Sequence, residues 1–223
     1  MTRDRDITGA IFDLDGTLLD SMGFWFTVGE RYVISKGCTP HGSVQEAIAT
    51  FNMAQAAEYF QDEYGITDTV PEIIAAFDQL LHDFYVEEVQ PLPGALEMLD
   101  ELGQRDIPYC IATTTDRIHV EAALRRLGIL DGFSFIITCS ELDTDKGHPD
   151  IYLESLRRLG TMKETTWIFE DAIHAIRTAA RAGFPICAIE EESMVPYRDE
   201  IRDLADVYVN DLRAWCWSGD QRC

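Results

Sequence analysis

From residue 93 onward, short apolar runs alternate with segments of helical periodicity. The apolar runs predict strands over residues 107–113, 133–138, 165–170, 184–189 and 206–210. The segments around them predict helices over residues 93–106, 116–128, 149–160, 172–183 and 195–205. Strands separated by helices of roughly ten to fifteen residues indicate βαβ units. They favour an α/β fold with a Rossmann-like parallel sheet covered by helices on both faces.

The pattern differs in the first part of the chain. Residues 7–12 form another apolar run, which predicts the first strand. Residues 24–37, 43–50, 54–65 and 71–89 then have helical spacing, and the breaks between them do not resemble strands. We therefore expect an all-helical insertion at residues 20–90, between the first and second strands. The α/β core domain would comprise residues 1–19 and 91–223.

The charge of the chain narrows the choice of partners. Its 223 residues include 18 basic and 40 acidic side chains, and the formal net charge is −22 at pH 7. Such an acidic surface repels nucleic acids and anionic membranes, so we expect neither as a partner. The sequence carries no readable signal for the oligomeric state, and a monomer is compatible with it.

Two features favour a cytoplasmic location. We find no apolar signal segment ahead of the first strand and no run long enough to span a bilayer. The cysteines form no CxxC pair and no metal-type spacing with histidine, so we expect reduced, mostly buried thiols. They are Cys38, Cys110, Cys139, Cys187, Cys216 and Cys223.

Polar side chains follow the predicted strands at the points where four of them end. They are, in chain order, Asp13 and Asp15, Thr113 and Thr114, Lys146, and Glu170 with Asp171. Each has an ordinary explanation by itself, such as turn chemistry for Asp-Gly, helix capping for Thr113 or Thr115, or a favourable helix dipole for Glu-Asp. The carboxyl ends of parallel strands share one edge, however, and the ordered set favours a common crevice.

The residue types in this set suit phosphoryl chemistry. Two carboxylates as close as Asp13 and Asp15 repel each other unless a cation or a shared proton offsets the repulsion. Carboxylates and backbone oxygens are suitable ligands for Mg²⁺, and a metal with an ammonium and a hydroxyl would neutralise a phosphoryl group. One aspartate could then attack phosphorus and the other could handle the leaving-group proton.

Four segments also resemble a known family. The stretches "DLDGT", "ATTT", "DKGHPD" and "FEDAIHAIRTAARAGF" are similar to the four ordered motifs of the haloacid dehalogenase-like (HAD) hydrolases. The position of the helical insertion resembles the subclass that includes phosphoglycolate phosphatases and β-phosphoglucomutases, in which such an insertion forms a cap domain. The resemblance extends over nearly the whole chain, and its first and fourth motifs are the most specific.

The resemblance implies a role for each residue of the set. Asp13 would be the nucleophile, and Asp15 would be the general acid/base. Thr113 and Lys146 would complete the catalytic set. The implied phosphate-binding residues are Thr113, Thr114 and Lys146. The implied ligands of a Mg²⁺ cofactor are Asp13, Asp15 through its carbonyl, Glu170 and Asp171.

Two departures from the family pattern affect neighbouring positions. The third motif has Gly147 and His148 where a Pro-x-Pro arrangement is frequent, and the fourth motif has Ala172 in place of a serine. His174, one helical turn beyond Asp171, could face the site or lie half-buried on its helix. Whether His148 or His174 takes part stays open at this stage.

The interpretation that we favour is a Mg²⁺-dependent phosphatase that hydrolyses a small phosphorylated metabolite through an aspartyl-phosphate. A sugar phosphomutase of the β-phosphoglucomutase type would use the same motifs. A non-catalytic binding protein with the same fold is a third possibility, although a non-catalytic relative could have lost any of these residues.

Overall fold

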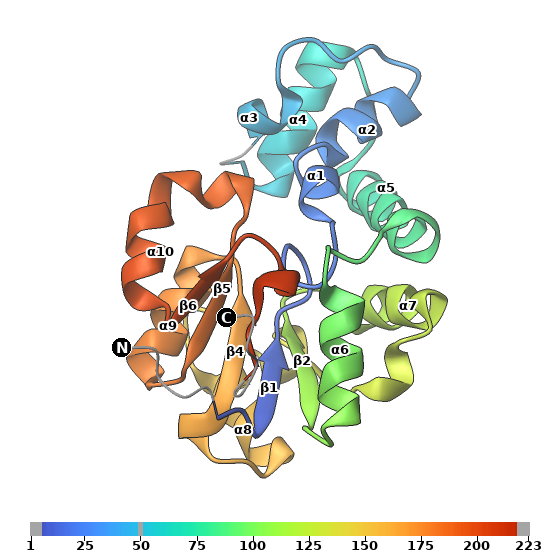
Figure 1. Cartoon of the computed structure of the whole chain (residues 1–223). Coiled ribbons are helices and arrows are strands. Elements are labelled where there is room, and N and C mark those ends of the chain that lie inside the picture. The colour runs from blue at the N-terminus through green and yellow to red at the C-terminus, as the bar shows by residue number, and fades with distance from the viewer. Residues whose placement is uncertain (1–5, 49–50, 218–223) are drawn as a thin grey trace. The chain divides into compact units, whose positions relative to one another are not determined.

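Six strands form one parallel sheet (Figure 1) in the computed structural model, which describes residues 6–48 and 51–217. They are β1 (Gly9–Phe12), β2 (Tyr109–Thr113), β3 (Ile136–Thr138), β4 (Thr166–Glu170), β5 (Ile186–Ile189) and β6 (Val207–Val209). Their order across the sheet is β3-β2-β1-β4-β5-β6, and each neighbouring pair is parallel. This is the Rossmann order, in which the direction of chain progression switches between β1 and β4. The predicted α/β fold class is confirmed.

Three helices cover one face of the sheet. They are α8 (Asp150–Leu159), α9 (Ile173–Ala182) and α10 (Arg198–Leu204). Tyr152, Ile176 and Ile201 from these helices are buried in one cluster with Ile11 and Ile168 of the central strands. The β1 and β4 strands are buried along their whole length, in agreement with the apolar sequence GAIF of β1 and the apolar centre WIF of β4.

Aromatic rings line the opposite face. Phe12 of β1 stacks on Phe169 of β4 with ring centroids 4.4 Å apart, and Trp215 packs against Phe169 at 5.1 Å. Helix α6 (Ala95–Gln104) packs against the turn Leu212–Ala214 that precedes Trp215. Figure 1 shows α6 in front of the sheet and α8 behind it. Helix α7 (Arg117–Leu127) connects β2 to β3.

The segment between β1 and α6 is helical, as predicted. It contains α1 (Met22–Trp25), α2 (Val28–Ser35), α3 (Val44–Ile48), α4 (Met53–Tyr64), α5 (Val70–Asp83) and the π-helical turn Phe84–Glu88. Tyr32, Phe60 and Ile73 form the centre of its own buried cluster. A reciprocal capping box between Asn52 and Gln55 begins α4, with hydrogen bonds of 2.9 and 3.0 Å. The last two residues of the helix predicted over 43–50 lie outside the described residues.

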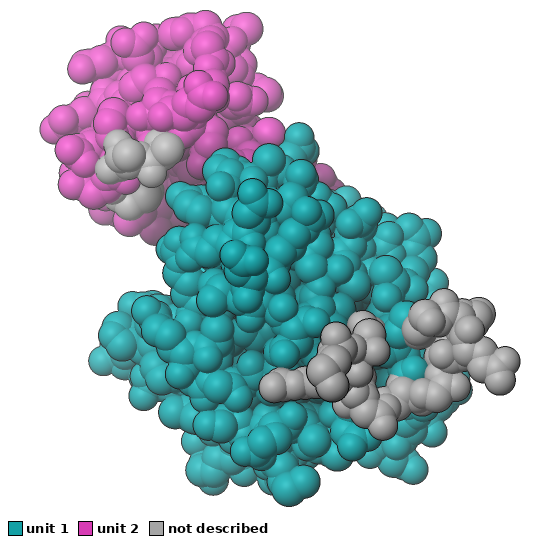
Figure 2. All heavy atoms as spheres, turned by 60° about the vertical axis from the view of Figure 1, so that its left-hand side comes forward, with its two compact units in different colours: residues 1–20, 90–223 teal, residues 21–89 magenta. Residues whose placement is uncertain are grey.

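The chain divides into two compact units (Figure 2). One comprises residues 1–20 and 90–223, and the other comprises residues 21–89. The two connections pair with each other at the edge of the first unit, where Asp20 N–H donates to the Gln90 carbonyl at 2.9 Å. Leu92 N–H donates to the Leu18 carbonyl at 2.8 Å. The helical insertion therefore leaves and re-enters the α/β unit at adjacent points.

The cysteine prediction holds for four residues and fails for one. Cys38, Cys110, Cys139 and Cys187 are not in disulfides, and the last three are buried. Cys216 is disulfide-bonded, so the prediction of a reduced thiol is wrong there, and Cys223 lies outside the described residues. In the part of the chain that the structure describes, no helix combines the length and the apolar character needed to cross a membrane.

Candidate active site

Asp13 and Asp15 lie just beyond the carboxyl end of the central strand β1. Asp13 is buried, and its N–H donates to the Phe169 carbonyl of β4 at 3.0 Å. Gly16 then turns the chain with φ of 80°, a value that glycine adopts without strain, and its N–H bonds to the Leu19 carbonyl at 2.9 Å. Both aspartates therefore lie where β1 meets β4, at the topological switch point where open α/β sheets bind ligands.

Lys146 reaches this point from the loop that precedes α8. Its side chain is 4% exposed. The ammonium donates to Oδ1 of Asp13 and, at 2.5 Å, to Oε1 of Glu170. Two strands and one loop thus contribute to a buried triad of two carboxylates and one ammonium.

Glu170 and Asp171 complete the acidic group from the end of β4. Oε2 of Glu170 accepts the N–H groups of Asp171 and Ala172 at 2.9 and 3.0 Å, which holds its carboxylate against its own backbone. The Thr17 hydroxyl donates to Oδ1 of Asp171 at 3.4 Å. Carboxylate oxygens of Asp13, Glu170 and Asp171 all lie within 4.8 Å of one another.

Burial makes these charges strongly interdependent. Burial, together with the nearby carboxylates of Glu170 and Asp15, raises the pKa of Asp13 to about 7 against the lowering effect of Lys146. Burial and the carboxylates of Glu170 and Asp13 raise the pKa of Asp171 well above its ordinary value. For Glu170 burial also favours a higher pKa, but the ammonium of Lys146 outweighs it and lowers the pKa.

This donor set fits a divalent cation. Three buried carboxylates lie close together and one ammonium pairs with two of them, so the fully ionised cluster carries an excess of negative charge in a poorly solvated place. Mg²⁺ binds carboxylate oxygens at about 2.0–2.1 Å, and ligand oxygens on opposite sides of the ion are therefore about 4.2 Å apart. The spacing within 4.8 Å is compatible with that arrangement after small side-chain adjustments.

The three threonines after β2 differ in their surroundings. Thr113 is buried, and its hydroxyl accepts the N–H of Thr115 at 3.1 Å. Thr114 is exposed. Thr115 is buried and donates its hydroxyl to Oδ2 of Asp15 at 2.6 Å. Asp116, rather than a threonine, is the N-cap residue of α7.

Several contacts were not predicted from the sequence. The hydroxyls of Thr17 and Thr115 each bond to a site aspartate, and the Tyr152 hydroxyl donates to Oε1 of Glu170 at 3.4 Å. The signal for the first two was present, since Thr17 belongs to "DLDGT" and Thr115 to "ATTT". Tyr152 had no such signal, because its position in α8 matches an ordinary buried helix position.

Both histidines left open by the sequence are exposed. Nδ1 of His148 lies 3.1 Å from Oδ1 of Asp145, and His174 lies on the exposed side of α9. The same Asp145 oxygen accepts the N–H of Gly147 at 2.6 Å. A Cβ on residue 147 would lie 2.8 Å from that oxygen, so glycine suits the turn that follows Lys146. The unusual "KGHPD" loop is thus closed by an aspartate side chain.

The α/β core with an inserted helical unit and a buried group of carboxylates around one lysine defines a recognisable class of protein. The family model of the haloacid dehalogenase-like hydrolases matches residues 10–189. The chain belongs to this family, as its four motifs predicted.

Curated relatives with similar sequences carry names that include a phosphatase. The chain is 25% identical over 203 residues to the bifunctional riboflavin kinase/FMN phosphatase of Arabidopsis thaliana, covering 91% of this chain and 52% of that protein. It is 29% identical over 196 residues to (DL)-glycerol-3-phosphatase 1, mitochondrial, of the same organism, covering 84% and 65%. It is 27% identical over 195 residues to hexitol phosphatase A of Escherichia coli (strain K12), covering 86% and 88%. The chain thus spans between half and two thirds of the length of the first two relatives.

Solved structures show the same fold. A HAD hydrolase of family IA, variant 3, from Entamoeba histolytica HM-1:IMSS has a TM-score of 0.73 at 19% identity, covering 94% of this chain and 96% of that one. CbbY from Rhodobacter sphaeroides in complex with phosphate has a TM-score of 0.68 at 22% identity, covering 93% and 96%. At these identities the likeness establishes the fold alone.

Proposed function

We propose that this chain is a Mg²⁺-dependent phosphatase that hydrolyses a small phosphorylated metabolite through an aspartyl-phosphate intermediate. The observation that carries the proposal is the buried ammonium of Lys146 between Asp13 and Glu170, with Asp171 beside them. A buried ammonium and a cation-binding group of carboxylates together provide the positive charge that a phosphoryl group requires. The family membership and the names of the curated relatives support the same reaction.

The residues divide the chemistry between two steps. In the first, a carboxylate oxygen of Asp13 attacks phosphorus, the bond from phosphorus to the ester oxygen breaks, and Asp15 protonates the departing oxygen. In the second, Asp15 accepts a proton from water as the water oxygen attacks phosphorus. Phosphate is released and the Asp13 carboxylate is regenerated. Lys146, Thr113 and Thr114 would hold the phosphate oxygens throughout.

The proposed Mg²⁺ would be held by Asp13, Glu170, Asp171 and the backbone carbonyl of Asp15. When bound, it would offset the charge of the carboxylates and of the incoming phosphoryl group. The glutamate is already held by two backbone N–H groups, which orients it before any ligand arrives. We further propose that the helical unit, residues 21–89, is the cap that selects the substrate.

A metabolite screen tests this proposal. The purified chain, incubated with Mg²⁺ and a panel of several dozen phosphorylated metabolites, is expected to release inorganic phosphate from p-nitrophenyl phosphate and from a subset of the panel. The matched blank is the same panel without protein, measured with the same phosphate reagent. No release from any compound would contradict the proposal and favour a non-catalytic binding protein.

The basic residues of the helical unit help to distinguish a phosphatase from a phosphomutase. Between residues 20 and 90 the sequence has two Lys or Arg residues, Arg31 and Lys36, against twelve acidic ones. Both cations are engaged within that unit. Arg31 lies 3.3 Å from Glu88 and over the ring of Phe24, and Lys36 forms an ion pair with Asp68. A mutase must bind a bisphosphate, and burying its distal phosphate without a cationic partner would cost several kcal/mol.

We therefore expect net hydrolysis of monophosphates whose remaining part is neutral. With β-glucose 1-phosphate and a catalytic amount of glucose 1,6-bisphosphate, inorganic phosphate should appear at a rate that does not depend on the bisphosphate. Both products are followed in the same reaction, by a phosphate assay and by coupled oxidation of glucose 6-phosphate. Faster formation of glucose 6-phosphate than of phosphate would favour the mutase instead.

A further inference from the structure

The hydroxyl of Thr115 contacts the carboxylate that the proposed reaction uses for proton transfer. It donates to Oδ2 of Asp15 at 2.6 Å, a short distance for an O–H···O bond, across 100 residues of sequence. The Thr115 residue is 7% exposed and Asp15 is half-buried, so this bond is partly shielded from competing water.

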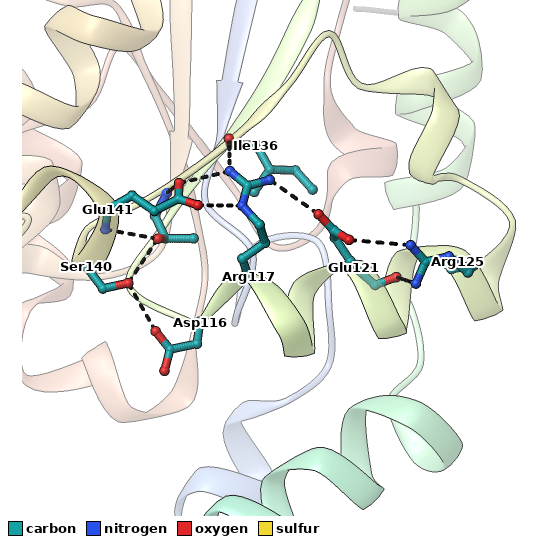
Figure 3. Close-up of polar contacts among 8 residues, drawn as sticks. Asp116, Arg117, Glu121, Arg125, Ile136, Ser140 and Glu141 are labelled. Carbon is teal, nitrogen blue, oxygen red and sulfur yellow. Dashed lines mark hydrogen bonds and ion pairs between the residues drawn. The ribbon is translucent and has the colours of Figure 1, made fainter.

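The backbone around Thr115 is held from both sides. On one side, its N–H bonds to the Thr113 hydroxyl at 3.1 Å. On the other side, Asp116 at the start of α7 is attached to the turn that follows β3 (Figure 3), where the Ser140 hydroxyl donates to its carboxylate at 3.0 Å. The Thr115 hydroxyl is therefore presented by a turn that is anchored to two strands.

Arg117 strengthens that attachment. Its guanidinium donates to the Ile136 carbonyl at 2.7 Å and forms a forked ion pair with Glu141, whose second bond is 2.8 Å long (Figure 3). A cation at the first turn of a helix opposes the helix dipole, and these acceptors offset that cost. The arrangement keeps the start of α7 in a constant position relative to β3.

We propose that Thr115 is a positioning residue that sets the orientation of the Asp15 carboxylate. The inference rests on the proposed role of Asp15 as general acid/base. The terminal torsion of an aspartate is intrinsically broad, so a carboxylate on a turn rotates easily. A hydrogen bond from an anchored donor restricts that rotation, and a misplacement of about 1 Å at a reacting group can cost on the order of 10²-fold in rate.

A purely structural role for Thr115 has a different kinetic signature. Loss of packing or of the β2–α7 turn would slow all substrates alike. Loss of Asp15 orientation would lower kcat/KM for those substrates whose leaving oxygen needs a proton. The attack of water on the aspartyl-phosphate also uses Asp15, but it follows release of the first product and does not enter kcat/KM. Alkyl phosphates need the proton, whereas p-nitrophenolate leaves with little help, so the ratio of the two kcat/KM values reports the positioning role.

The central variant is Thr115→Val, which keeps the branched shape and removes the hydroxyl. We expect kcat/KM for an alkyl phosphate such as glycerol 3-phosphate, or for the best alkyl substrate from the screen, to fall roughly 10- to 100-fold. The kcat/KM for p-nitrophenyl phosphate should fall by less than about threefold, and Thr115→Ser should restore most of the alkyl value. The matched control is Thr166→Val, a buried threonine at the opposite end of β4, for which both rates should stay as in the parent.

A double-mutant cycle with Asp15→Asn makes the test specific. Asp15→Asn alone is expected to slow the alkyl phosphate by about 10²- to 10⁴-fold, the usual range for general acid/base catalysis. Adding Thr115→Val to Asp15→Asn should change the remaining rate by less than about twofold, because the group that Thr115 orients no longer transfers a proton. Thr115→Ala is made in parallel, since its smaller side chain fits the site if valine prevents folding.

The outcomes separate the two proposals. A parent protein that hydrolyses neither substrate overturns the proposed function and this inference with it. An active parent in which Thr115→Val, or Thr115→Ala in its place, lowers kcat/KM for both substrates equally overturns the inference alone. The inference is also overturned if the substitution has the same effect with and without Asp15→Asn. A selective loss for the alkyl phosphate, restored by serine, supports it.

Discussion

Asp13→Asn is expected to abolish turnover while the fold is retained. The amide is nearly isosteric with the carboxylate but cannot attack phosphorus, so kcat for p-nitrophenyl phosphate should fall by roughly 10⁴-fold or more. Losses of that size follow removal of nucleophiles in other covalent enzymes. They correspond to about 5.5 kcal/mol of activation free energy. The measurement is release of inorganic phosphate, with circular dichroism to confirm the native secondary structure.

The stability of this variant provides a second readout. The pKa of Asp13 is raised from 3.8 to about 7, so its contribution to stability falls as the pH rises through that window. Above pH 7, in the absence of a bound cation, the ionised side chain therefore destabilises the fold. A neutral asparagine does not carry this cost, and the midpoint of thermal unfolding at pH 7.5 should not decrease.

The control for Asp13→Asn is the same substitution at an exposed aspartate. Asp131, in the turn Leu130–Gly132, is exposed, and Asp131→Asn should leave both kcat and unfolding unchanged. If Asp13→Asn kept activity within about tenfold of the parent, the carboxylate would contribute at most about 1.4 kcal/mol to lowering the activation free energy. That result would contradict the assignment of Asp13 as the nucleophile.

Removal of divalent cations is expected to have an effect of similar size. Treatment with EDTA should abolish phosphate release, and added Mg²⁺ should restore it. Ca²⁺ should not restore it and should inhibit in competition with Mg²⁺. Ca²⁺ takes more ligands at longer distances, and it would hold Asp13 in a geometry unsuited to in-line attack. Full activity of the metal-free protein would rule out the proposed mechanism.

Thermal unfolding measures cation binding without any substrate. A ligand at ten times its Kd stabilises the folded state by about 1.4 kcal/mol. For a chain of this size, each kcal/mol raises the unfolding midpoint by about 2–4 °C. Mg²⁺ should raise the midpoint of the parent by about 3–6 °C, and the shift should be much smaller for Asp171→Asn. An equal shift in both proteins would place the cation elsewhere.

The layer structure of the core was predictable because it depends on local patterns. Continuous apolar runs indicate strands buried on both faces, and their alternation with helical segments indicates a parallel sheet. The exact starts of the strands were less predictable. The run predicted from residue 133 pairs as a strand only from Ile136, because the length of a strand depends on its partner as well as on its own apolar character.

The grouping of charged residues at one edge was also accessible from the sequence. Asp13 and Lys146 come after the first and third predicted strands and Glu170 ends the fourth, and parallel strands bring their carboxyl ends to the same edge. The structure adds that one ammonium bridges two of these carboxylates. It also shows Thr114 exposed, whereas the sequence grouped it with the buried Thr113.

Hydroxyl contacts across the core could not be predicted in the same way. The bond from Thr115 to Asp15 joins residues 100 positions apart. The bond from Tyr152 to Glu170 joins helix α8, which packs against one face of the sheet, to the end of β4. The succession of strands and helices along the chain follows from periodicities that each segment carries by itself, and the chemistry expected at the strand ends follows from the residue types found there. Which side chain meets which depends on strand register, helix packing and rotamers, and these become defined when separate segments bury a common surface. The family and its acidic edge could therefore be inferred from residue patterns, while the orientation of each proposed catalytic group required the folded core.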